Sequence, residues 1–444
     1  MKPPGFRSAL ASEAFRRLCL AHGLATVGQL VLTLAVAVHV LAETQSGLWV
    51  SVTFALAFAP YALFSALAGV LADRRSRSAV LAGAAWVRAG LTVVVLVGTA
   101  LGWPVGLVVV VTALVAVAAT PSYPALAAAT RECVPDRDLP AANALVTCVE
   151  NVTWIAGPGV FGVLVLVEAG TQGAVLAAVA LFVVAGLAAA AVRLARPARA
   201  EATGWLRDLV AGVRTVARRP EVRGPMTLAV LDNFLYGYLV VAIVLLADAA
   251  PDGAEPLGRL NATLTAGALA SMGVVNRLVR GGRTSTVLAV TLLGFCGALL
   301  ALGAVGATVV GLALVAVAGG TTLVAEVAAV TLLQRGTDNA TLARVFGVYD
   351  QLNVGAIALG SLLAGPLSTQ LGARGALVGV AAAGLVLVLP ALVTDVRRRA
   401  LGFSPWPTTS SSFLPSTSRA AAPSSWSREL PDPRRPSATP SRLR

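Results

Sequence analysis

Ionisable side chains inside long apolar segments are the residues of this sequence best placed to do chemistry. Four carboxylic acids and one base interrupt such segments: Glu150, Asp232, Glu326, Asp350 and Arg88. A charged side chain within a membrane is costly unless it is paired or hydrated, and residues of this kind mark ion and proton pathways. Each acid lies about seven to ten residues from the same end of its segment, so the four share a depth of roughly 10–15 Å. This arrangement predicts a hydrated vestibule whose acids carry protons or contact a bound molecule, with Asp232 and Glu326 the strongest candidates.

Structural roles remain open for each of these acids. An acid in a membrane helix can form an ion pair, for example with Arg88, or can cap a nearby helix end. Further polar side chains lie at similar depths in the apolar segments. They are Gln29, Thr120, Tyr123, Asn233, Tyr236 and Thr322.

Several kinds of catalytic site are excluded by residue type. A phosphate-binding P-loop requires a Gly-Lys-Ser/Thr sequence, and Lys2 is the only lysine. The two histidines, His22 and His39, fall in one apolar segment without partners at metal-ligand spacing, and we interpret them as packed or interfacial side chains. No serine has the context of a nucleophile elbow. We therefore expect no enzyme activity, no metal and no cofactor.

The elements that must position these residues are membrane-spanning helices. The chain has 444 residues, of which 57% are hydrophobic and 12% charged, and its mean hydropathy is +0.81. A soluble protein is closer to one-quarter charged. The sequence predicts an all-α polytopic membrane protein with twelve transmembrane helices. We place them at 18–41, 48–71, 79–100, 105–129, 141–166, 172–195, 224–248, 258–280, 284–304, 306–333, 343–369 and 373–394.

Basic residues indicate how these helices are oriented. Of the 34 Lys and Arg residues, only Arg259 and Arg374 fall on the predicted outer side, and Arg88 lies within a span. Cytoplasmic loops carry such an excess of bases in membrane proteins. We therefore predict a multi-pass protein of the inner (plasma) membrane with both termini in the cytoplasm. The net charge of +13 thus reflects a membrane face and not a nucleic-acid site.

Internal similarity divides the chain into two halves. The segment 72–81 aligns with 279–288, and Gly157 and Gly162 align with Gly360 and Gly365. We predict a six-helix half at 1–195, a second at 224–399, and a cytoplasmic linker at 196–223 that is amphipathic over 205–216. The segment 400–444 is rich in Ser, Thr, Pro and Ala and is predicted to be a disordered cytoplasmic tail.

The connection between the second and third spans has a distinctive pattern, Gly-x-x-x-Asp-Arg-x-x-Arg, formed by Gly69, Asp73, Arg74 and Arg77. It resembles the signature loop of the major facilitator superfamily. Further stretches resemble the drug-efflux branch of that family, the macrolide-efflux and siderophore-exporter-like proteins. They are Phe15-Arg16-Arg17-Leu18, Val134-Pro135-Asp136-Arg137-Asp138-Leu139 and Thr331-Leu332-Leu333-Gln334-Arg335.

The resemblance implies a gating role for this loop. In related transporters the Asp lies against the start of the eleventh helix when the cavity faces outward, where a carboxylate meets free N–H groups. Here Asp73 would meet the helix that begins near Arg344, and Arg77 would hold the loop through Glu132. The alternative is that the loop is only a topology anchor.

Exporters of the superfamily often have a Gly-Pro-x-x-Gly-Gly motif in the fifth helix. This chain has Gly157 and Pro158 and keeps the last glycine, Gly162, but has Phe161 at the preceding position. The resemblance implies an antiporter-type structural kink. The alternative is a helix that is simply bent and closely packed.

Three functions follow from the resemblance and the buried acids. The first is a proton-coupled bacterial exporter of amphipathic small molecules that works by alternating access. The second is a nutrient importer or facilitator of the same fold, and the third is a non-transporting membrane sensor or scaffold. The expected partners are a small-molecule substrate, the proton and the lipid bilayer, and we expect a monomer.

Overall fold

The computed structural model is all-helical over the residues that it describes. These are 6–72, 76–135, 138–192, 194, 213–249, 255–280, 283–306, 308–337 and 341–400. The helices are α1 (Phe6–Ala9), α2 (Glu13–Thr44), α3 (Gly47–Ala72), α4 (Arg77–Ala100), α5 (Val105–Ala119), α6 (Ser122–Cys133), α7 (Leu139–Leu166), α8 (Gly170–Ala190), α10 (Pro220–Asp248), α11 (Glu255–Arg280), α12 (Thr284–Val305), α13 (Val309–Gly336) and α14 (Leu342–Ala400). The predicted all-α fold class is confirmed.

The predicted spans fall on these helices, with two local differences. The span predicted at 105–129 is divided between α5 and α6, because Pro121 has no backbone N–H to continue the first helix. The last two predicted spans both lie in α14, which consists of two helical segments joined at Gly372. Gly372 adopts φ 72°, and the chain reverses direction there. A positive φ is easily adopted by glycine. Within the described residues, nine segments are long and apolar enough to cross a membrane, and one of these, Val345–Pro390, includes that bend.

Helix ends follow from local side chains. The hydroxyl of Ser12 accepts a hydrogen bond from the N–H of Phe15 at 3.3 Å and starts α2. Thr308 caps α13 in the same way through the N–H of Gly311, at 3.1 Å. Such caps satisfy N–H groups that have no partner within the helix.

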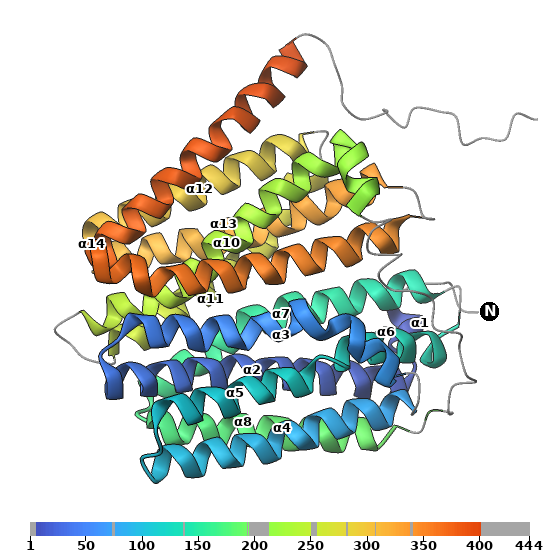
Figure 1. Ribbon diagram of the computed structural model, residues 1–444. Coiled ribbons are helices and arrows are strands. Elements are labelled where there is room, and N and C mark those ends of the chain that lie inside the picture. The colour runs from blue at the N-terminus through green and yellow to red at the C-terminus, as the bar shows by residue number, and fades with distance from the viewer. Residues whose placement is uncertain are drawn as a thin grey trace, which may run out of the picture. The chain divides into compact units, whose positions relative to one another are not determined.

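The helices form two groups that follow chain order (Figure 1). In the first group α2 packs on α7 and α8, and α8 also packs on α4. In the second group α13 packs on α11 and α12, and α10 packs on α14. The main contacts between the groups are α3 with α14 and α7 with α11.

Glycines allow both contacts between the groups. A Cβ at Gly162 of α7 would collide with the carbonyl oxygen of Gly258 in α11, and a Cβ at Gly365 of α14 would collide with the backbone of Gly47 in α3. The N–H of Gly365 also donates to the hydroxyl of Ser51 at 2.7 Å. Small residues permit this close approach of membrane helices. Both contacts lie at the end of the bundle opposite the start of α2, and we call them the glycine joints.

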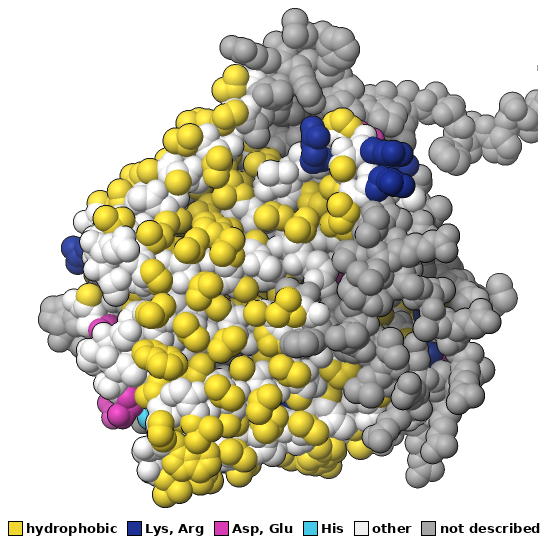
Figure 2. Space-filling view, viewed as in Figure 1, with side chains coloured by type: hydrophobic (Ala, Val, Ile, Leu, Met, Phe, Trp, Pro, Cys, Tyr) yellow, Lys and Arg dark blue, Asp and Glu magenta, His cyan; other side chains and the backbone are white. Residues whose placement is uncertain are grey.

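The surface suits a lipid environment. Figure 2 shows one face on which hydrophobic side chains cover most of the described area and charged side chains gather near its edges. Large apolar side chains such as Val310 (59% exposed) and Leu387 (63% exposed) point outward. In water such a surface would be unfavourable, whereas lipid tails solvate it.

Parts of the predicted linker and tail lie outside the described residues. Of the helix predicted at 205–216, the structure describes only the end, where residues 213–218 are helical. The segment 401–444 is not described. The division into halves at 196–223 remains a prediction.

Candidate functional site

A cavity of about 640 Å³ lies between the two groups of helices. Its lining includes His22 near the start of α2 and Gln334 near the end of α13, so it occupies the part of the bundle away from the glycine joints. All four acids and the base singled out in the sequence line this cavity, as do the six polar side chains predicted at similar depth. Their shared depth in seven separate predicted spans therefore corresponds to one cavity.

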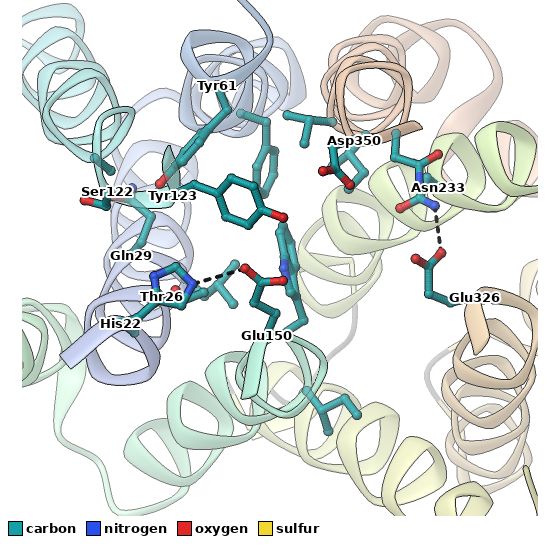
Figure 3. Close-up of a pocket in the computed structure, with 18 of the residues that line it drawn as sticks. His22, Thr26, Gln29, Tyr61, Ser122, Tyr123, Glu150, Asn233, Glu326 and Asp350 are labelled. Carbon is teal, nitrogen blue, oxygen red and sulfur yellow. Dashed lines mark hydrogen bonds and ion pairs between the residues drawn. The ribbon is translucent and has the colours of Figure 1, made fainter. Parts of the chain in front are cut away.

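The wall formed by α2 to α8, which we call the N-terminal wall, contains both bases of the cavity lining. In it the Nε2 atom of His22 lies 3.3 Å from the Oε1 atom of Glu150. The two side chains are 12% and 24% exposed, so water reaches the pair from the cavity. Figure 3 shows the ring of Tyr123 extending from the same wall into the space between Glu150 and Asp350.

Arg88 lies deeper in the N-terminal wall. Its Nη2 atom donates to the carbonyl oxygen of Ala25 at 2.8 Å and to the Oε1 atom of Gln29 at 3.1 Å. Its guanidinium carbon lies 4.2 Å from the ring centroid of Phe182. In the described residues no acid forms an ion pair with Arg88, so the structural alternative that paired it with one of the four acids is wrong.

The wall formed by α10 to α14, the C-terminal wall, contributes acids but no base to the cavity lining that the structure describes. Thr322 donates to the Oδ2 atom of Asp232 at 2.8 Å. The phenol of Tyr349 donates to the Oε1 atom of Glu326 at 2.6 Å. The amide of Asn233 donates to the Oε2 atom of Glu326 at 3.3 Å, a contact that Figure 3 shows. These bonds join α10, α13 and α14 into one polar network.

Asp232 has an unsatisfied atom in this network. The residue is 2% exposed, and its Oδ1 atom has no hydrogen-bond partner among the described residues. A buried carboxylate oxygen without a donor is unfavourable. A bound proton or a substrate donor would satisfy it.

Aromatic rings form the apolar part of the cavity lining. The rings of Phe58 and Trp154 stack with centroids 5.6 Å apart, and Trp154 meets Tyr236 edge-on at 6.5 Å. The three rings come from α3, α7 and α10, so the series crosses from one wall to the other. The cavity can therefore hold an apolar group beside its acids.

Comparison with known proteins identifies the kind of protein to which this cavity belongs. A sequence model of the family described as transmembrane secretion effector (MFS_3) matches residues 6–402. The chain belongs to this family. It is therefore a multi-pass membrane transporter of the major facilitator superfamily and not an enzyme.

Solved transporter structures share the fold of this transporter. Two crystal structures of the nucleoside transporter NupG, one of them a point mutant, match it. The mutant is 12% identical with a TM-score of 0.68, and the match covers 86% of this chain and 99% of NupG. The other structure is 13% identical with a TM-score of 0.63, and the match covers 85% of this chain and 99% of NupG. The human organic anion transporter MFSD10 (TETRAN) is 17% identical with a TM-score of 0.60, and the match covers 88% of this chain and 100% of that chain. No curated protein matches the chain.

Two side chains that contact the acids of the transporter's cavity were not recognised as their partners in the sequence analysis. His22 was interpreted as a packed or interfacial histidine, but it faces Glu150 in the cavity. The signal was present, because His22, Thr26 and Gln29 follow helical spacing and share one face of α2. Tyr349 was also missed; its role depends on contact with a different helix, which no local pattern reveals.

The predicted gating residues are only partly described. Arg77 forms an ion pair with Glu132, as the loop hypothesis required. Asp73 and Arg74 lie outside the described residues, and neither the surroundings of Gly69 nor the side chain of Arg344 is described. The function of the loop as a latch remains a prediction.

The glycine motif of the fifth span is fully described. α7 continues through Pro158, whose side chain lines the cavity. Gly157 packs against the side chain of Leu30, and Gly162 forms one of the glycine joints. Close packing is thus one role of the motif, and its link to antiport remains a prediction.

Proposed function

We propose that this chain is a secondary active exporter that moves amphipathic small molecules across the bacterial plasma membrane in exchange for protons. The observation that carries the proposal is the C-terminal wall, where Asp232, Glu326 and Asp350 line the cavity and no base is among the lining residues that the structure describes in this wall. Carboxylic acids in such a setting can exchange protons, because no positive charge among the described lining residues of this wall favours the ionised form.

The amphipathic character of the substrate is supported by the cavity lining. The rings of Phe58, Trp154 and Tyr236 offer an apolar surface beside the acids of the C-terminal wall. Outward movement is supported by the family description, transmembrane secretion effector, and by the resemblance to drug-efflux proteins. The distribution of arginines supports cytoplasmic termini, in which case the cavity faces the cytoplasm and the glycine joints close the outer side.

The same geometry supports alternating access. We propose that the halves 1–195 and 224–399 rock about the glycine joints, open the outer side and bring the cytoplasmic ends together. The acids would then release protons to one side and receive them from the other. The proposed unit is a monomer, since each wall of the cavity comes from this one chain.

Import is the second candidate function, because the nucleoside transporter NupG shares the fold. Direction is not determined by a helical framework. The two candidates differ in the sign of the coupled proton movement.

Inside-out membrane vesicles test both candidates. Respiration acidifies the vesicle lumen and quenches quinacrine fluorescence, and a panel of amphipathic compounds and nucleosides is then added. A proton-coupled exporter restores fluorescence when its substrate enters the lumen in exchange for protons. No recovery with any compound, set against vesicles without the protein, would contradict the proposal. In right-side-out vesicles a proton-coupled importer instead carries protons inward with its substrate.

A further inference from the structure

Arg88 is a buried base that the proton-exchange mechanism does not use. The residue is 3% exposed, lies in α4 and lines the cavity. Both of its observed hydrogen bonds run from Nη2, to the carbonyl oxygen of Ala25 and to the amide oxygen of Gln29. The ring of Phe182 covers the guanidinium at 4.2 Å.

These neighbours orient Arg88 but do not neutralise it. Each acceptor is an uncharged oxygen, and a ring face attracts a cation without carrying a net charge. The Nε atom has no hydrogen-bond partner among the described residues, and no acid there forms an ion pair with this arginine. A buried cation without a counter-ion is unfavourable, so its retention in a cavity wall indicates a ligand that supplies the missing charge.

We propose that Arg88 binds a carboxylate of the substrate and that the substrate is amphoteric, with an anionic group at one end and a cationic group at the other. The inference rests on the proposed function, since it assumes that this cavity holds the transported molecule. The planar guanidinium matches the geometry of a carboxylate and can bind it through two hydrogen bonds. Gln29 and Ala25 hold the guanidinium in place for this contact.

The opposite wall explains the cationic end. Asp232, Glu326 and Asp350 offer only carboxyl groups, so an ammonium group of the substrate competes there with protons. Such competition is what proton exchange requires, because one ligand must weaken the binding of the other. A substrate with only an anionic group would not compete for these acids.

Matched ligands isolate the contact at Arg88. The probes are 3-(1-naphthyl)alanine, which carries a carboxylate and an ammonium group, and 2-(1-naphthyl)ethylamine, which lacks the carboxylate. Binding of each tritiated probe to purified full-length protein is measured by scintillation proximity without a pH gradient. We expect wild type to bind the amino acid about tenfold more tightly than the amine, as a charge-assisted hydrogen bond contributes that much.

The variant Arg88→Gln should remove this difference, so that both probes bind with equal affinity. Arg88→Lys should keep part of it, because the charge remains without the planar fork. The matched control is Arg335→Gln in α13, a base outside the cavity lining that donates to Thr284, and it should retain the wild-type difference.

Three results would overturn the proposal: wild type binding the two probes equally, wild type binding neither, or Arg88→Gln weakening both by the same factor. If size-exclusion chromatography shows that Arg88→Gln does not fold, the proposal is decided by the binding of the two probes to wild type and to Arg88→Lys. The outcome is separate from that of the proposed function, because binding without a gradient does not depend on proton-driven exchange.

Discussion

The two walls of the cavity hold their charges in different ways. In the N-terminal wall His22 and Glu150 are partners, and Arg88 is fixed by neutral oxygens. In the C-terminal wall Asp232 and Glu326 bond only to a hydroxyl, a phenol and an amide. The first wall is therefore suited to holding a bound group, whereas the second is suited to gaining and losing protons.

The internal repeat explains why the walls can differ. Gly162 and Gly365 occupy equivalent positions and both make glycine joints. At the same sequence offset, Glu150 corresponds to Asn353, and both line the cavity. The repeat is thus preserved where backbones must approach each other, while the side chains that do chemistry have diverged.

The largest effect is expected from neutralising the C-terminal wall. Asp232→Asn or Glu326→Gln should reduce proton-driven exchange to background, because each variant removes a proton carrier while keeping side-chain shape. Glu150→Gln should reduce it only partly. Quinacrine recovery in inside-out vesicles measures the rates, and size-exclusion chromatography of the purified variants controls for folding. Normal exchange in both C-terminal variants, with loss in Glu150→Gln, would reverse the assignment of the walls.

The next effect is expected at the joint between the walls. Gly365→Ala places a methyl group against the backbone of Gly47, and such overpacking costs about 1–3 kcal/mol. Thermal unfolding of the purified protein should therefore occur at a lower temperature. The matched control is Gly355→Ala in the same helix, where no atom outside the adjoining helix backbone lies within 4 Å of the added Cβ, and it should be neutral or stabilising. Equal behaviour of the two variants would show that the joint is not tightly packed.

A smaller effect is expected from the pair in the N-terminal wall. His22→Gln and Glu150→Gln should each slow exchange by a few fold, and the double variant should be no slower than the more severe single variant. Coupling of this kind is expected when two side chains act through their mutual contact. Additive effects on the exchange rate would indicate that the 3.3 Å contact has no functional role.

The smallest effect is expected from the ion pair between the start of α4 and the end of α6. Arg77 and Glu132 are 18% and 29% exposed, and partly exposed ion pairs contribute about 0.2–1 kcal/mol. Arg77→Gln and Glu132→Gln should therefore slow exchange by no more than about fivefold. The charge swap Arg77→Glu with Glu132→Arg should restore most of the rate if attraction between the two is what matters. Failure of the swap would favour the topology-anchor interpretation for Arg77.

The sequence by itself determined that the chain is an all-helical, multi-pass membrane protein and at which positions along its helices the ionisable residues lie, whereas the orientation of the helices in the membrane remains a prediction. These properties are local: a run of apolar residues long enough to cross a bilayer must form a helix, and bases remain on one side. Depth follows from counting residues along a helix, which is why Glu150, Asp232, Glu326 and Asp350 were placed together. The start of the eleventh predicted helix, at residue 343, was also correct to within one residue, since α14 begins at Leu342.

Only the tertiary structure decided which of these residues meet. Two helices at the same depth can present different faces to each other, and that rotation depends on how their small and large side chains pack. This rotation brings His22 to Glu150 and lets Tyr349 donate a hydrogen bond to Glu326. It also leaves Arg88 without an ion pair to any acid that the structure describes. Helical periodicity limits which residues share a face, whereas packing selects the partner that the face meets.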